Sequence, residues 1–113
     1  MAEALIRGLL RGGQADVSAI LASAPRTERC EELSRKYGIF ATTDNTVLVA
    51  RSEIVVLAVK PQILRKVLDE IADKLRPDAL IVSLAAGVPV AAIESRLRPL
   101  TRVIRSMPNM PAL

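Results

Sequence analysis

The chain has 113 residues, half of them apolar, which suffices for one hydrophobic core but not for two ordinary domains. Lys and Arg outnumber Asp and Glu by 16 to 12, but a single Phe, a single Tyr and no Trp argue against an aromatic platform for stacked nucleic-acid bases. The lack of histidine removes histidine-based triads, histidine general bases and most zinc sites, so we expect no metal.

A helix over residues 2–10 is the first predicted element. Its apolar residues follow helical spacing, and Gly12 and Gly13 supply the stop expected just past a helix end. The same segment contains Glu3 and Arg7, and it is too short and too charged for a signal peptide or a membrane span. The sequence therefore predicts a cytoplasmic protein that does not enter a membrane.

A buried strand is predicted next, over the apolar run at residues 17–22, which ends before Ser23-Ala24-Pro25. Thr27 is positioned to cap the following helix, which runs to Gly38. Cys30 lies in that helix and is the only cysteine of the chain. We expect a buried structural thiol there, because it has no partner for an internal disulfide and no histidine to activate it.

The rest of the chain alternates short apolar runs with helical patterns. Asp44 or Asn45 is expected to cap a brief helix, and Pro61 opens the clearest helix of the chain, which Pro77 ends. Further strands are predicted at 39–42, 53–59, 79–84 and 101–106, with another helix at 89–97. Strands that alternate with helices predict an α/β fold with a doubly wound parallel sheet, in one domain over residues 1–113.

Three predicted strands end in abrupt turns. These turns are Ala58-Val59-Lys60-Pro61, Ser83-Leu84-Ala85-Ala86-Gly87-Val88 and Arg105-Ser106-Met107-Pro108-Asn109-Met110-Pro111. Because open α/β sheets bind ligands outside the carboxyl ends of their strands, the turns predict one shared crevice. Taken singly, Lys60 also suits a solvated residue before a helix, Ala85-Ala86-Gly87 suits close packing, and Asn109 suits a residue that satisfies its own turn.

A fourth strand end, at Ser23-Ala24-Pro25-Arg26, contains no acid that could bind the ribose hydroxyls of NAD. It offers a hydroxyl and a guanidinium instead, and nothing there would repel a 2′-phosphate. A dinucleotide site at this position would therefore favour NADP over NAD. An ordinary polar turn with a surface arginine is the alternative interpretation.

These residues together closely resemble the amino-terminal domain of pyrroline-5-carboxylate reductase. The resemblance covers the whole chain, from Met1-Ala2-Glu3-Ala4-Leu5 through the three strand-end turns. It implies a Rossmann-like doubly wound sheet and an enzyme that uses NADPH or NADH. Such enzymes reduce the C=N bond of Δ1-pyrroline-5-carboxylate, a small-molecule imine, to L-proline in the last step of proline biosynthesis.

The resemblance also implies which residues contact the cofactor. Ser23 and Arg26 match the region that meets the adenosine 2′-phosphate, and Asn45 matches a polar contact to the adenosine portion. Ala58-Val59-Lys60-Pro61 matches the loop along the ribose and pyrophosphate, and Ala85-Ala86-Gly87 lies beside the nicotinamide. No catalytic side chain is expected, because hydride transfer to a protonated imine chiefly needs a dry, oriented encounter of two rings.

Both ends of the chain depart from the family pattern, and the residues near the carboxyl end correspond to part of the substrate site. The family begins with a strand and Gly-x-Gly-x-x-Met, of which Met1 is the last member, so the first strand and both glycines are missing and the sheet is incomplete. Met107-Pro108-Asn109 corresponds to the floor between cofactor and substrate. The family then continues into a helical domain that forms the homo-oligomer, whereas this chain stops at Leu113. We therefore expect a partial dinucleotide-binding domain that forms no proline by itself and has poor solubility.

Other functions remain open on the residues alone. One is a non-catalytic dinucleotide-binding or interaction module that uses the exposed gap in the sheet or the basic surface. Nucleic-acid binding through the +4 charge is a second, less favoured interpretation, and we expect no nucleic-acid partner. Within enzymes, a β-hydroxyacid dehydrogenase or a deazaflavin-linked NADP reductase is a third, against which the terminal Met-Pro-Asn string argues.

Overall fold

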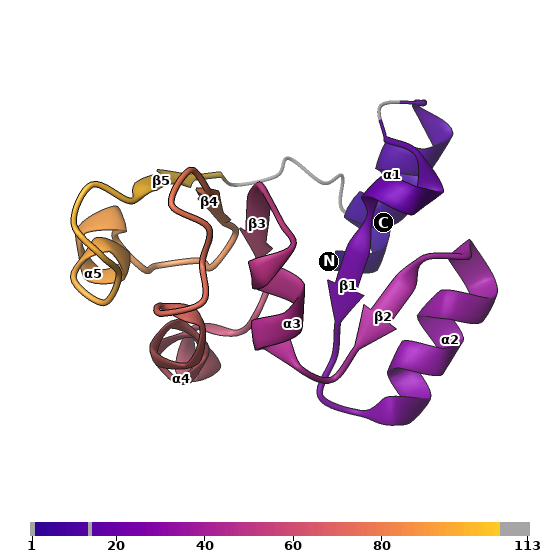
Figure 1. The fold of residues 1–113 in the computed structure, drawn as a ribbon, viewed down its shortest axis with the longest axis horizontal. Coiled ribbons are helices and arrows are strands. Elements are labelled where there is room, and N and C mark those ends of the chain that lie inside the picture. The colour runs from indigo at the N-terminus through magenta and orange to yellow at the C-terminus, as the bar shows by residue number, and fades with distance from the viewer. Residues whose placement is uncertain (1, 14, 107–113) are drawn as a thin grey trace. The chain divides into compact units, whose positions relative to one another are not determined.

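The computed structural model describes residues 2–13 and 15–106, and its elements are drawn in Figure 1. The chain divides into two compact units, Met1–Leu48 and Val49–Leu113. Helix α3 (Asn45–Ala50) crosses the division between them. Each unit is built around its own parallel sheet, so each is described separately.

The first unit consists of two short paired strands with helices packed against them, and it includes the first turn of α3. Its remaining elements are α1 (Ala2–Arg11), a 3-10 turn (Val17–Ala19), β1 (Leu21–Ser23), α2 (Thr27–Tyr37) and β2 (Phe40–Thr42). Strand β1 runs parallel to β2, with Leu21 opposite Phe40 and Ser23 opposite Thr42. The small core consists of Ile6, Ile20 and Ile39. Gly38 caps the carboxyl end of α2, and its φ of 73° suits glycine.

Two local predictions for this unit are wrong. The run at 17–22 does not form a single strand, because the Asp16 carboxylate accepts the Val17 N–H at 3.2 Å and holds a 3-10 turn, so β1 starts only at Leu21. Thr27 is the first helical residue of α2, and the residue at the cap is Arg26, whose side chain makes no capping hydrogen bond. The helix over residues 2–10, the strand near 39–42 and the buried Cys30 are confirmed.

The second unit has three parallel strands in the order β3-β4-β5. Its elements are β3 (Ile54–Leu57), α4 (Pro61–Ile71), β4 (Leu80–Ser83), α5 (Val90–Glu94) and β5 (Arg102–Arg105). The helices α4 and α5 cover one face of the sheet, as Figure 1 shows. Their side chains bury Val55, Leu57 and Ile81 there. The predicted strands and helices exist but are shorter than expected, because their ends continue as turns, as after Ile71.

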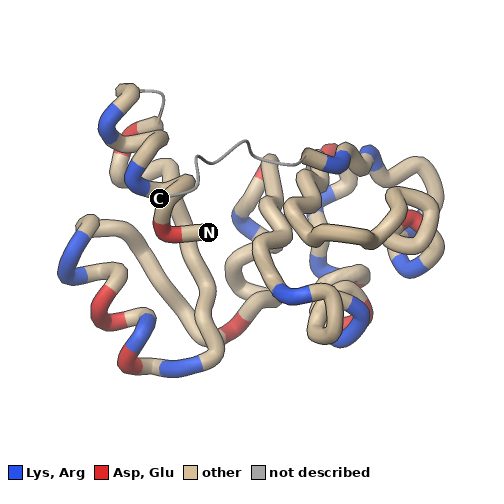
Figure 2. The backbone as a smooth tube through the Cα atoms, turned by 180° about the vertical axis from the view of Figure 1, so that it is seen from behind, with Lys and Arg blue, Asp and Glu red and all other residues tan. Residues whose placement is uncertain are grey.

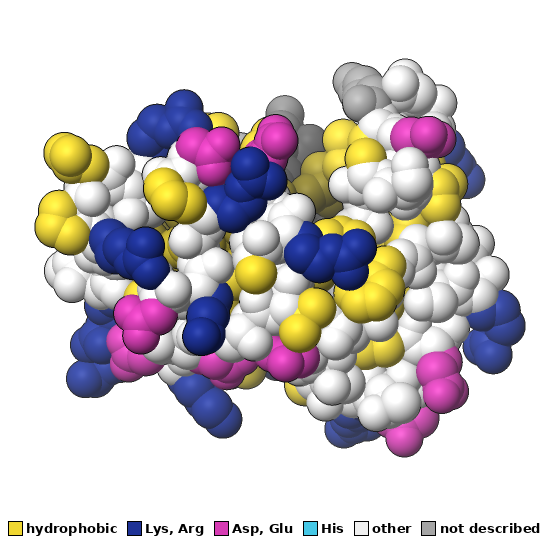
Figure 3. All heavy atoms as spheres, viewed as in Figure 1, with side chains coloured by type: hydrophobic (Ala, Val, Ile, Leu, Met, Phe, Trp, Pro, Cys, Tyr) yellow, Lys and Arg dark blue, Asp and Glu magenta, His cyan; other side chains and the backbone are white. Residues whose placement is uncertain are grey.

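The opposite face of this sheet keeps apolar side chains at the surface. Val56 of β3 and Ile104 of β5 lie on this face, each in register with Val82 of the central strand β4. Their exposed fractions are 38% and 50%. Ile54 at the start of β3 is 61% exposed. Apolar side chains are visible among the charged ones in the space-filling view of Figure 3. Exposed apolar rows of this kind are associated with partner contact or aggregation.

The parallel α/β arrangement is therefore confirmed, but it occurs as two sheets. Among the described strands, β1 pairs only with β2, and β3 pairs only with β4. Both strands thus keep one unpaired edge, as expected for a doubly wound sheet that is incomplete. Figure 2 shows Lys and Arg interspersed with Asp and Glu along the helices. No helix within the described ranges is long and apolar enough to cross a membrane.

Candidate functional site

The carboxyl ends of β3, β4 and β5 lie side by side at one edge of the second sheet. The Leu84 N–H donates to the Leu57 carbonyl at 3.0 Å, which joins the end of β4 to that of β3. The Ser106 N–H donates to the Ser83 carbonyl at 2.9 Å, which joins the end of β5 to that of β4. The turns that follow β3 and β4 therefore leave the same edge of the sheet, as the sequence predicts.

The first of these turns is Ala58-Val59-Lys60-Pro61, which leads from β3 into α4. Lys60 is the cap residue of α4, and its carbonyl accepts the N–H groups of Ile63 at 2.9 Å and Leu64 at 3.2 Å. Pro61 occupies the first helical position, where a missing N–H costs nothing. The Lys60 side chain is exposed and forms no ion pair with any carboxylate of the described residues. An ammonium group is thus available at the positive end of the helix dipole.

The second turn, Ala85-Ala86-Gly87, follows β4 and is hydrogen-bonded to the side chain of Ser83. The Ser83 side chain is fully buried, and its Oγ accepts the Ala85 N–H at 3.2 Å. Ala85 is buried, whereas Ala86 and Gly87 are exposed. Gly87 has a φ of 76°, and a Cβ built there would meet no atom within 4 Å. The turn therefore presents small residues with open space in front of them.

In the first unit, Ser23 and Asn45 are in direct contact. Ser23 ends β1 and Asn45 opens α3, and the Ser23 hydroxyl donates to Asn45 Oδ1. Both side chains are half-buried. Arg26 follows at the amino-terminal end of α2, where it is exposed. No side chain caps α2, and the Arg29 N–H donates to the Arg26 carbonyl at 3.1 Å, so the N–H groups of Thr27 and Glu28 are the ones open to an anion.

Asp44 fixes the loop that carries Asn45. Its carboxylate accepts the Thr46 N–H at 2.9 Å and the Thr46 hydroxyl at 2.6 Å, and its own N–H donates to Thr42 Oγ1 at 3.1 Å. These hydrogen bonds from Thr46 lower the pKa of the Asp44 carboxyl. Of the two caps considered for the brief helix, Asp44 is the one observed, and Asn45 is left to contact Ser23.

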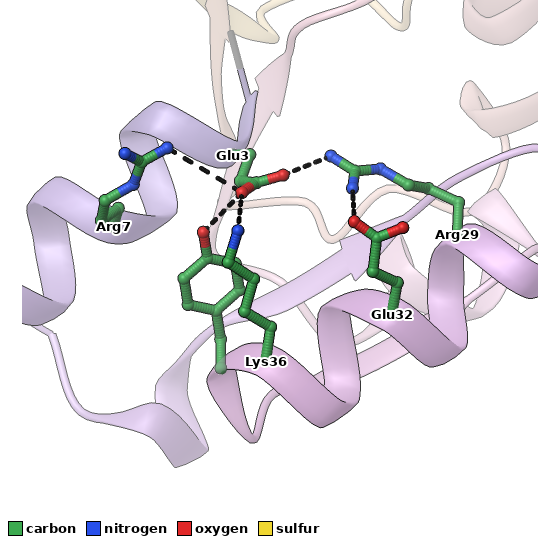
Figure 4. Close-up of polar contacts among 6 residues, drawn as sticks. Glu3, Arg7, Arg29, Glu32 and Lys36 are labelled. Carbon is green, nitrogen blue, oxygen red and sulfur yellow. Dashed lines mark hydrogen bonds and ion pairs between the residues drawn. The ribbon is translucent and has the colours of Figure 1, made fainter.

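Glu3 ties α1 to α2, as Figure 4 shows. Its carboxylate accepts hydrogen bonds from Lys36 at 2.8 Å, from the Tyr37 hydroxyl at 2.7 Å and from Arg29 at 2.7 Å. Arg7, one turn along α1, adds an ion pair at 3.8 Å. The hydrogen bonds from Lys36, Tyr37 and Arg29 hold the pKa of the Glu3 carboxyl well below its usual range. The first turn of α1 is thereby fixed against α2.

The predicted residues thus form two groups within the described chain. Ser23, Arg26 and Asn45 belong to the first unit, while Ala58-Val59-Lys60-Pro61 and Ala85-Ala86-Gly87 belong to the second. That the two groups serve one cofactor stays a prediction. Four predicted residues lie outside the described residues, namely Met1, Met107, Pro108 and Asn109.

Two structural features beside the predicted residues could not be recognised from the sequence. Ser83 supports the Ala85-Ala86-Gly87 turn, and the available signal was a single polar residue at the end of an apolar strand. Glu3 gathers Lys36, Tyr37 and Arg29 across 26 to 34 positions of the chain, and no local pattern indicates such long-range pairing.

Comparison with known proteins gives the family. The family model described as NADP oxidoreductase coenzyme F420-dependent matches residues 1–87. The chain belongs to this family.

Within the family, the similarity that the sequence indicates is to pyrroline-5-carboxylate reductases, and it is confirmed. A relative of that name from Methanosarcina acetivorans is 40% identical over 112 residues, which cover 99% of this chain and 42% of the relative. The structure of a pyrroline-5-carboxylate reductase from Coxiella burnetii superposes with a TM-score of 0.90 at 33% identity, over 97% of this chain and 41% of that one.

A more distant structure is similar in fold alone. It is the pyrroline carboxylate reductase of Plasmodium falciparum, solved with NADP bound, which has a TM-score of 0.80 at 22% identity and covers 95% of this chain and 38% of that chain. The chain of this family member thus spans about two fifths of the length of the relatives it matches.

Proposed function

We propose that the chain is the dinucleotide-binding part of an NADP-dependent reductase that converts Δ1-pyrroline-5-carboxylate to L-proline. One observation carries the proposal. The turns after β3 and β4 leave the same sheet edge, in a chain that is 40% identical over 99% of its length to a pyrroline-5-carboxylate reductase. The Plasmodium falciparum enzyme was solved with NADP bound, which supports NADP as the cofactor.

The end of β1 suits a 2′-phosphate. Ser23 contributes a hydroxyl, Arg26 a guanidinium, and the uncapped first turn of α2 contributes N–H groups at the positive end of the helix dipole. The strand end contains no carboxylate that would bind the ribose hydroxyls of NADH and repel the 2′-phosphate of NADPH. We therefore expect NADPH to bind more tightly than NADH.

The turns of the second unit suit the other half of the cofactor. Lys60 offers an ammonium group and the amino-terminal end of α4 for the phosphate and ribose. Ala86 and Gly87 are exposed, and the space in front of Gly87 leaves room for a flat ring beside the backbone. When bound, NADPH supplies the hydride, and the chain's residues orient the nicotinamide and exclude water.

The substrate side is proposed from the resemblance. Met107-Pro108-Asn109 would form the floor between nicotinamide and imine, and Met1, the last member of the family's Gly-x-Gly-x-x-Met, would contact the cofactor. The substrate is then a small cyclic imine that arrives already protonated, so no side chain needs to act as an acid or base. We also propose a cytoplasmic location and, for the whole enzyme, a homo-oligomer.

Arg26→Ala tests the cofactor preference, with Arg35→Ala as the matched control, since Arg35 is an exposed arginine in the last turn of the same helix. We expect Arg26→Ala to weaken NADPH binding by about ten- to a hundredfold and to leave NADH binding unchanged, because a charge-assisted hydrogen bond contributes about 1.5 to 3 kcal/mol. Arg35→Ala should change neither affinity. Equal binding of NADPH and NADH by the unaltered chain would contradict the proposal.

A deazaflavin-linked NADP reductase is the second candidate, because the family is described as coenzyme F420-dependent. The identity of 40% to a pyrroline-5-carboxylate reductase along 99% of the chain favours the imine as substrate. Binding of coenzyme F420 by the chain in addition to NADPH would reverse this order.

A further inference from the structure

Ser83 is the buried polar residue of the described chain, with a side chain that is fully inaccessible. It stands at the end of β4, whose other residues, Leu80, Ile81 and Val82, are apolar. A buried hydroxyl needs a hydrogen-bond partner, because an unsatisfied polar group in a core is destabilising. Its partner is the Ala85 N–H, two residues along the chain, at 3.2 Å.

The Ala85 N–H in turn needs a hydrogen-bond acceptor. Ala85 is 4% exposed, so its N–H cannot turn to water in the folded chain. The Ser83 hydroxyl therefore replaces the strand acceptor that Ala85 loses when the chain leaves β4. This short-range bond bends the backbone ahead of Gly87, whose φ of 76° completes the turn.

Ser83 also sits where three strand ends join. Its carbonyl accepts the Ser106 N–H at 2.9 Å, and the next residue, Leu84, donates to the Leu57 carbonyl at 3.0 Å. A displacement of the Ser83 backbone would thus be transmitted to the end of β5 and to the turn after β3. These are the elements that carry the proposed nicotinamide side of the site.

We propose that Ser83 is a positioning residue that sets the Ala85-Ala86-Gly87 turn for the nicotinamide half of NADPH. The inference rests on the function proposed above and adds to it a residue that never touches the cofactor. Ser83 acts through the Ala85 N–H: with the bond present, the exposed backbone of Ala86 and Gly87 is held at one distance from the sheet edge. Without it, the turn is free to rotate toward another acceptor.

The test compares Ser83→Ala with Ser95→Ala, using binding followed by amide chemical shifts. Ser95 is the matched control, because its hydroxyl also makes a local bond, to the Ala92 carbonyl at 2.8 Å, but at an exposed helix end. Two probes separate the halves of the site: NADPH, which spans both, and adenosine 2′,5′-bisphosphate, which has only the adenosine half.

We expect Ser83→Ala to weaken NADPH binding about five- to tenfold, which corresponds to the net value of one hydrogen bond. Its affinity for adenosine 2′,5′-bisphosphate should stay within about twofold of the unaltered chain, because that probe does not reach the turn. Hydrogen exchange of the Ala85 amide should accelerate. Ser83→Thr, which keeps the hydroxyl, should restore both the slow exchange and the NADPH affinity, and Ser95→Ala should alter neither.

Equal NADPH affinity in the unaltered chain and in Ser83→Ala would overturn the inference and leave the proposed function standing. A parallel loss for both probes would also overturn it, since it would mean general destabilisation. If the unaltered chain binds no NADPH, the proposed function fails and the inference fails with it. Should Ser83→Ala not fold, Ser83→Cys takes its place, because its thiol has a similar volume and is a weaker acceptor.

Discussion

The Ser23 hydroxyl donates to Asn45 Oδ1, which joins the carboxyl end of β1 to the first turn of α3. Twenty-two positions separate the two residues, so the bond holds two loops of the first unit in one geometry. Both residues belong to the proposed adenosine half of the site. The bond therefore links the stability of this unit to the shape of the surface proposed to bind adenosine.

Asn45→Ala removes the acceptor in this pair. We expect the free energy of unfolding to fall by about 1 kcal/mol, the usual value for a part-buried hydrogen bond, which a urea titration measures. Asn45→Asp keeps an acceptor for the Ser23 hydroxyl and serves as the control. An Asn45→Ala protein with an unchanged urea midpoint would show that the bond contributes nothing.

Glu3→Gln tests the junction between α1 and α2. The folded-state pKa of Glu3 lies below the unfolded value of about 4.3, so the carboxylate stabilises the fold at neutral pH, and this contribution is lost as the pH falls below that value. We expect Glu3→Gln to be less stable than the unaltered chain at pH 7, with a difference that shrinks steadily below about pH 4.

Urea midpoints measured from about pH 7 down to about pH 3 check this prediction. Glu31→Gln is the control, because Glu31 is an exposed glutamate of α2 with no ion pair to any described residue. A stability difference for Glu3→Gln that does not depend on pH would place the effect in packing and would rule out a contribution from the carboxylate charge.

The turn after β4 depends on Gly87. Gly87→Ala should lower the free energy of unfolding by about 1 to 2 kcal/mol, because an L-residue is unfavourable at a φ of 76°. Steric clash is not the cause, since the added Cβ would meet no atom within 4 Å. Gly8→Ala is the matched control: it lies inside α1 with equally open surroundings, and there the change should raise stability by up to about 1 kcal/mol. Thermal unfolding of the two variants gives opposite shifts if backbone conformation decides.

Ile54→Lys addresses the exposed apolar face of the second sheet. Ile54 is 61% exposed at the start of β3, whose second edge is unpaired among the described strands. A lysine there should raise solubility, since charges on exposed strands oppose edge-to-edge pairing. Val55→Lys, on the covered face where Val55 is 5% exposed, should instead prevent folding. Light scattering against concentration measures the first effect, and an unchanged aggregation threshold would refute it.

Hydrophobic periodicity was enough to predict most of the elements. The helix beginning at Pro61 and the strands β3, β4 and β5 follow from apolar spacing and from proline positions that short-range rules describe. The predicted lengths were too long, because element ends depend on local hydrogen bonds. At Asp16, one carboxylate converts the start of a predicted strand into a 3-10 turn.

The site was less accessible to sequence reasoning. Lys60 and Gly87 could be predicted as strand-end residues because turn chemistry is local. The contact of Ser23 with Asn45, and that of Glu3 with Lys36, joins residues 22 and 33 positions apart, which no periodic pattern encodes. The inward direction of Ser83 likewise depends on how the three strand ends meet.

Amide chemical-shift mapping of the chain as NADPH is added tests the central claim most directly. We predict that amides of Ser23 and Arg26 in the first unit and of Lys60, Ala86 and Gly87 in the second shift together, with one common dissociation constant. NADH should shift the amides of Lys60, Ala86 and Gly87 more strongly than those of Ser23 and Arg26. Shifts confined to other surfaces, or two sets that saturate at unrelated concentrations, would contradict the claim that these strand ends hold a single NADPH.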